Sequence, residues 1–155
     1  MTGAKIVHKN PGALDSIVPK FKKAAEEEIA LGFPAGTAES YPDGTSVVEV
    51  AASHVFGVEV PKRDFMAFAK DGIRDKTEPI LRQMASLGDG DEKGISALRE
   101  AAGQAGQSAI RAAITELRKP PNSPATIAAK GSDNPLIDTT HMRDSVTYVF
   151  RKRTR

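Results

Sequence analysis

Two long helical patterns joined by a short glycine-rich turn constrain the fold more than any other feature of this sequence. Apolar residues recur at spacings of three and four over residues 64–87 and again over residues 92–117, as they do along one face of an α-helix. The tetrapeptide GDGD at 88–91 separates the two patterns, and the KPP tripeptide at 119–121 ends the second helical pattern. We therefore predict two long helices, with a kink in the first at Pro79.

These helices need an inward face, and the apolar positions define it. In the second helix, Ile110 and Ile114 widen the apolar stripe, and the small residues at 101–106 allow close approach of another helix. The other residues that we expect to point inward are Phe65, Phe68, Ala69, Ile73, Ile80, Leu81 and Met84 in the first helix, and Ile95, Leu98, Ala102, Ala105, Ala109, Ala113 and Leu117 in the second.

The remaining elements are shorter. A helical pattern covers residues 11–30, and a short helix over 46–56 is favoured over a strand because Gly57 supplies a stop. A turn of helix begins at the Ser-Pro pair of 123–124, and Asp138 with Thr139 is interpreted as the cap of another short helix. The candidate strands are 29–33, 58–60 and 145–151.

Together these elements predict an α+β fold in which several helices, two of them long, pack on a small antiparallel sheet. A chain of 155 residues fits one domain. We assign residues 1–150 to a single α+β domain and residues 151–155 to a basic C-terminal tail. An open edge on so small a sheet is able to pair with a neighbouring copy.

Composition bears mainly on the environment. The chain has no cysteine, which suits a reducing cytoplasm, and its net charge is only +2. No segment approaches the roughly 20 apolar residues that span a bilayer, and the N-terminus carries no apolar signal core. We expect a soluble protein that folds inside the cell and has no membrane partner.

A search for chemistry finds no convincing catalytic or metal site. The three histidines, His8, His54 and His141, lie in separate segments without the spacing of metal ligands. The acidic residues of the 88–92 turn lack the twelve-residue spacing of a calcium loop. We therefore predict no catalytic residue, no metal and no cofactor, and we interpret His54 as a packed histidine. A small hydrolase or metal enzyme is the least favoured reading.

The C-terminal tail is the one feature that suggests nucleic acid. It holds four cations, Arg151, Lys152, Arg153 and Arg155, within five residues, and cations of this kind contact phosphates. No aromatic residues alternate with them, so a solvated terminus and contact with an acidic partner stay open as alternatives.

Eight short segments occur in order along the chain: GFP at 32–34, YPDGTS at 41–46, VAASHVFG at 50–57, VPKRDFM at 60–66, SPATI at 123–127, KG at 130–131, PLIDT at 135–139 and RDSVTY at 143–148. Together they resemble a family of tailed-bacteriophage neck, tail-completion or virion-morphogenesis proteins. The resemblance covers about residues 29–151, and the departures include Thr140, where the family usually has glycine, together with Val55, Asp64 and a shorter linker at 58–59.

The resemblance implies a structural virion protein at the head–tail junction that assembles as a ring around the DNA channel. Its partners would be copies of itself, neighbouring connector and tail proteins, and packaged DNA through non-specific contacts. A closed ring requires a head-to-tail interface. A nucleic-acid-binding module that uses the basic tail is the alternative.

Two regions are the expected contacts with a neighbouring subunit or partner. One is the loop that contains Phe56, Gly57, Pro61 and Phe65, and the other is the turn formed by Leu136, Ile137 and Asp138. The competing interpretation is that the large apolar residues among them complete the core of the subunit, and for Phe65 and Ile137 the two interpretations carry equal weight.

Overall fold

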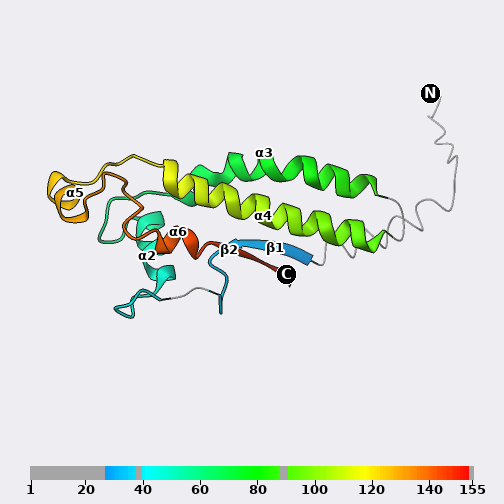
Figure 1. Ribbon diagram of the computed structural model, residues 1–155, viewed down its shortest axis with the longest axis horizontal. Helices are drawn as coiled ribbons and strands as arrows, with labels where there is room; N and C mark the ends of the chain where they lie inside the picture. The colour runs from blue at the N-terminus through cyan, green and yellow to red at the C-terminus, as the bar shows by residue number, and fades with distance from the viewer. Residues whose placement is uncertain (1–26, 38–39, 88–90, 154–155) are drawn as a thin grey trace, which may run out of the picture. The chain divides into compact units, whose positions relative to one another are not determined.

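The computed structural model describes residues 27–37, 40–87 and 91–153. The elements in chain order are β1 (Glu27–Gly32), α2 (Val47–Phe56), α3 (Phe65–Ser86), α4 (Glu92–Glu116), α5 (Pro124–Lys130), α6 (His141–Asp144) and β2 (Thr147–Lys152), as drawn in Figure 1. Contacts divide the chain into a large unit, Ala30–Val149, and a small one whose described residues are 27–29 and 150–153. The assignment of residues 1–150 to one domain stays a prediction.

The sheet consists of β1 and β2, paired antiparallel, among the residues described. The predicted α+β class is therefore confirmed. The predicted strand at 58–60 is wrong, because this segment bends and Glu59 has a φ of 62°, which an extended strand does not allow. The predicted helix over 11–30 is wrong at its end, which belongs to β1, and its earlier part lies outside the described residues along with His8.

The two long helices are confirmed, and both begin at an aspartate cap. The Asp64 carboxylate accepts the backbone N–H of Ala67 at 2.9 Å, and Asp91 accepts that of Gly94 at 2.8 Å, so each satisfies an otherwise free donor of the first turn. The helices α3 and α4 lie side by side (Figure 1). Proline 79 lies inside α3 without ending it.

Two residues of α3 that were expected to point inward are exposed. Phe68 is 53% exposed and Leu81 is 42% exposed. Among the described elements, α3 packs against α4 and, to a smaller extent, α2. Because few elements cover it, an apolar side chain on its outer side stays in solvent.

The core lies where α2, the start of α3, the second half of α4, α6 and the residue just before β2 meet. Its fully buried large side chains are Phe65, Ile110, Ile114, Val47 and Val146. Two of the small residues of α4, Gly103 and Gly106, lie against side chains of the strands, whereas the sequence suggested a helix as their neighbour. A Cβ at Gly103 would lie 2.4 Å from the Tyr148 ring, and one at Gly106 would lie 2.6 Å from Leu31.

The short helices position the loops between them. Helix α2 is confirmed and stops at Gly57, which has a φ of 76°. Helix α5 is confirmed and starts at Ser123, whose hydroxyl accepts the N–H of Thr126 at 3.1 Å. The predicted cap of α6 is wrong, because Thr140 occupies that position in a left-handed conformation with a φ of 63°. Neither Asp138 nor Thr139 caps the helix.

Candidate interaction groove

An open groove of about 630 Å³ lies on the large unit. Its walls come from α2, from the loop between α2 and α3, from the segment between α4 and α5, from α5 itself, and from residues 135–142. Such a volume is within the range of ligand and peptide sites. We take this groove as the candidate functional site.

Six of the eight segments that carry the family resemblance meet at this groove, and the segments at 32–34 and 143–148 do not line it. The 41–46 segment contributes Tyr41, α2 contributes His54, and the 60–66 segment contributes Pro61. Later in the chain, the 123–127 segment contributes Ser123, and the 135–139 segment contributes Leu136. Stretches separated by almost a hundred residues of sequence therefore form one continuous surface.

Arg63 is the most buried charged residue of the groove wall, with only 4% of its surface exposed. Its Nε donates to the Pro120 carbonyl at 2.9 Å, and its Nη2 donates to the Pro121 carbonyl at 3.2 Å and to Oδ1 of Asn122 at 3.1 Å. All three acceptors are neutral, and no carboxylate of the described residues forms an ion pair with this guanidinium. Burial lowers the pKa of Arg63.

Asn134 organises the opposite side of the same cluster and is also buried. Its amide nitrogen donates to the Thr115 carbonyl at 3.0 Å, and its Oδ1 accepts the backbone N–H of Leu136 at 3.1 Å. Its backbone carbonyl oxygen accepts a hydrogen bond from Nδ2 of Asn122 at 3.4 Å and another from the Lys130 ammonium at 3.2 Å. Two cations, Arg63 and Lys130, are thus attached to one network of neutral amides.

His54 interacts electrostatically with both cations, Arg63 and Lys130. Its pKa is lowered first by burial and then by repulsion from Arg63 and Lys130. The imidazole is therefore neutral near pH 7, because its ordinary value already lies below that. Its Nδ1 atom is buried without a hydrogen-bond partner, and a buried polar atom in this state costs free energy.

A second polar cluster surrounds Tyr41. Its ring packs on His141 with centroids 4.8 Å apart. The pKa of Tyr41 is raised by burial and then by the negative charges of Asp138 and Asp43. The groove therefore has cations around His54 and carboxylates around Tyr41, a mixed character that a polypeptide with both signs of charge complements well.

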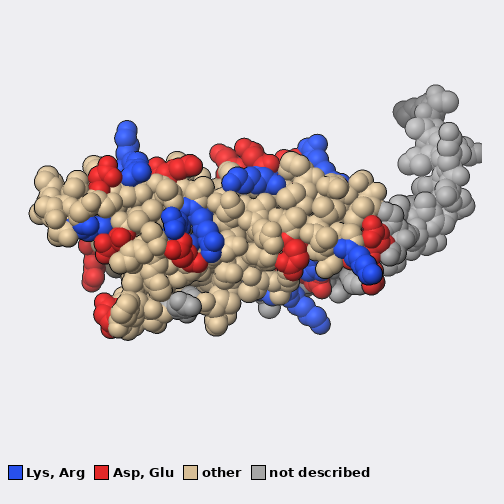
Figure 2. Space-filling model, viewed as in Figure 1, with Lys and Arg blue, Asp and Glu red and all other residues tan. Residues whose placement is uncertain are grey.

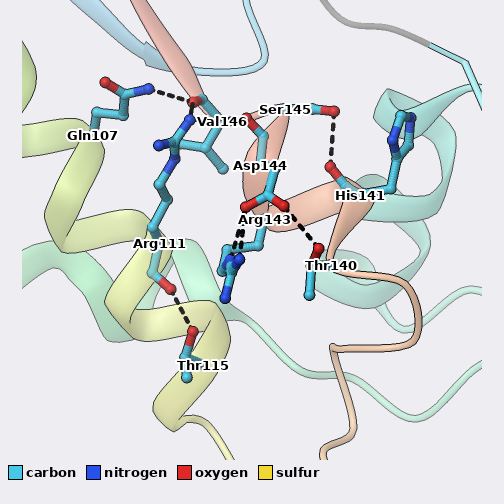
Figure 3. A network of polar contacts seen from close by, with 9 residues as sticks. All are labelled: Gln107, Arg111, Thr115, Thr140, His141, Arg143, Asp144, Ser145 and Val146. Atoms are coloured by element: carbon cyan, nitrogen blue, oxygen red, sulfur yellow. Dashed lines mark hydrogen bonds and ion pairs between the residues drawn. The ribbon is translucent and has the colours of Figure 1, made fainter.

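A network of hydrogen bonds fixes the wall formed by α6, and Figure 3 shows it. From α4, Nε2 of Gln107 and Nη2 of Arg111 donate to the Val146 carbonyl at 2.7 and 2.9 Å. The Thr140 hydroxyl donates to the Asp144 carboxylate at 2.7 Å, which ties the start of α6 to its end. The bonds to Val146 hold the end of this segment against α4, so this side of the groove is fixed to a long helix.

The expected contact residues separate into surface and core. Pro61, Leu136 and Asp138 line the groove, and Phe56 is 73% exposed beside Gly57. Phe65 is completely buried and fills the core, which is a correction to its expected contact role.

Leu136 shows only 6% of its surface, and Ile137 is half-buried against the core. Most of each of these two side chains therefore packs in the core of the subunit and not on its surface.

The basic tail is partly built into the structure. Arg151 and Lys152 belong to β2, and Nε of Arg151 lies 2.7 Å from the Glu28 carboxylate. Lys152 and Arg153 are exposed, and Arg155 lies outside the described residues. Figure 2 shows basic and acidic side chains interspersed on the face it presents.

The polar residues that organise the groove were not predicted from the sequence; they are Arg63, Asn122, Lys130 and Asn134. In the portion of the chain that is described, no three His, Cys, Asp or Glu side chains are grouped to hold a metal ion. None of the described helices is both long and apolar enough to cross a membrane. Comparison with protein-family models, curated proteins and solved structures gives no match.

Proposed function

We propose that this chain is a structural component of a tailed-bacteriophage virion, located at the head–tail junction. Each subunit joins its neighbours in a ring around the DNA channel and contacts the connector and tail proteins on either side. Its work is geometric and involves no reaction.

One observation carries the proposal. Six of the eight segments that resemble the neck and tail-completion family converge on a single groove, and those at 32–34 and 143–148 lie outside it. A resemblance spread over unrelated parts of a fold would support common packing only, whereas its convergence on one exposed surface supports a shared contact surface.

The surface next to the groove also suits contact with another protein. Phe56 and Val58 are 73% and 55% exposed, and residues 59–61, which follow directly, line the groove. Large apolar side chains that are exposed in the free subunit are candidates for the buried anchors of a protein interface. A ring uses different patches on the two sides of each subunit, so this face is one half of the proposed contact.

Binding of nucleic acid is a weaker candidate for the main role. Arg151 is engaged with Glu28, and in the described tail only Lys152 and Arg153 are exposed cations without a carboxylate partner among the described residues. Contact of these two residues with packaged DNA is compatible with a ring position.

The test is complementation of a phage that carries an amber mutation in the gene for this chain. We expect the mutant to accumulate filled heads and separate tails, and we expect the purified protein to restore joined, infectious particles. Phe56→Asp should lose this activity, whereas Phe68→Asp, a matched change at an exposed phenylalanine of α3, should retain it. Normal particles from the amber mutant would overturn the proposal.

A further inference from the structure

The cationic cluster in the groove has no counterion within the described chain. Arg63 and Lys130 both line the groove, and both bind only neutral oxygen atoms. Glu59 lines the same groove, yet it forms no ion pair with either cation among the described residues. A buried cation that lacks a counterion is held at a free-energy cost.

His54 adds a second unsatisfied group at this place. Its Nδ1 is buried and has no partner, and both cations reach it electrostatically. Two cations and an imidazole nitrogen able to carry a proton match the needs of a carboxylate, which accepts several hydrogen bonds at once. A bound carboxylate would offset the charge of the two cations and would favour the protonated form of the imidazole.

We propose that Arg63, Lys130 and His54 form a carboxylate-binding corner, and that it takes an Asp or Glu side chain from a polypeptide segment of a partner protein laid in the groove.

Two features favour a polypeptide over a small anion. The groove has a volume of about 630 Å³ and continues past the corner to the carboxylates near Tyr41, which leaves room and complementary charge for flanking residues. The exposed apolar residues Phe56 and Val58 adjoin its wall. The choice of a protein partner rests on the proposed function, whereas the carboxylate chemistry rests on the groove alone.

The test uses the full chain, labelled with ¹⁵N, and a pentapeptide probe, acetyl-Ala-Ala-Glu-Ala-Ala-amide, in an NMR titration. We expect saturable shifts of the His54 and Lys130 signals and a rise in the pKa of His54 when the peptide is bound. The same peptide with Gln in place of Glu should bind at least tenfold more weakly, the loss expected when a charged hydrogen bond of about 1.5 kcal/mol is removed.

Variants assign the effect to the corner. Lys130→Met should weaken binding about tenfold, whereas Lys62→Met, at an exposed lysine in the same loop region that pairs with Asp64, should not change it. Equal binding of the Glu and Gln peptides, or an unchanged affinity in Lys130→Met, would overturn the proposal. Equally tight binding of acetate or inorganic phosphate would replace the polypeptide by a free anion and overturn that part.

The outcome is separable from that of the proposed function. The titration uses the isolated chain, so a failure of binding alongside a ring at the head–tail junction would remove only the carboxylate corner. Binding without any place in the virion would remove only the phage role.

Discussion

Replacement of Arg63 by methionine is the sharpest test of how the groove is held together. Methionine keeps an unbranched stem of similar reach, and it removes the guanidinium that joins the start of α3 to the segment after α4. The change leaves the carbonyls of Pro120 and Pro121 and the side-chain oxygen of Asn122 without their donor. We expect the variant to fold and to be clearly less stable.

The magnitude follows from the three bonds that are lost. A hydrogen bond to a charged group contributes about 1.5–3 kcal/mol. The residues Pro120 and Pro121 are exposed, so their carbonyls regain water, while Asn122 is half-buried and recovers less. The buried charge itself carries a desolvation cost that methionine removes. We therefore expect a net loss of about 2–4 kcal/mol in the free energy of unfolding.

Urea unfolding followed by circular dichroism measures this loss. Arg118→Met is the matched control, because Arg118 is exposed and forms a single ion pair with Asp133 at 3.3 Å, which contributes about 0–1 kcal/mol. A loss below about 1 kcal/mol for Arg63→Met, equal to that of the control, would refute the view that Arg63 fastens the groove wall.

Two further predictions concern the packing of α4 and the cap of α6. Gly103→Ala should destabilise the fold by about 1–2 kcal/mol because the new Cβ would meet the Tyr148 ring at 2.4 Å. Gly72→Ala, whose Cβ would have its nearest neighbour at 3.8 Å, should stabilise the fold by about 0.5–1 kcal/mol. Urea unfolding midpoints compare the two variants, and a shift of both midpoints in the same direction would contradict the close approach at Gly103. The pKa of Asp144 lies below its ordinary value, first because the Thr140 hydroxyl binds its ionised form. The stabilisation from this carboxylate is therefore present above pH 3.8 and lost as the pH falls through the lower folded pKa. Thr140→Val should move that pKa back up, and an unchanged NMR titration of the Asp144 carboxyl group would count against the hydrogen bond.

The elements that sequence reasoning predicted well are those whose signals are local. Helices α3 and α4 have long apolar periodicity, and the structure adds an aspartate cap at the start of each helix that was not predicted. Gly57 stops α2 for an equally local reason, since its left-handed φ of 76° suits glycine.

The errors arise where tertiary contacts decide. Phe68 belongs to the apolar repeat of α3, but no described element covers that side, so it is exposed. Thr140 adopts a positive φ that its type disfavours, and its hydroxyl bond to Asp144 helps to hold this conformation.

The groove itself was only half predictable. Pro61, Leu136 and Asp138 were found through the family resemblance, and the structure places all three on its wall. Arg63 was not found, because arginine is normally exposed and its burial depends on carbonyl groups 57 and 58 positions later in the chain. A single sequence carries no sign of such a contact.

The central claim, a ring at the head–tail junction, is tested most directly by cryo-electron microscopy of intact particles of the phage that encodes this chain. Reconstructions of the junction with rotational symmetry should contain a ring into which the large unit, Ala30–Val149, fits, with the groove facing a neighbouring protein. Absence of the chain from the junction, confirmed by mass spectrometry of the purified particles, would contradict the proposed function.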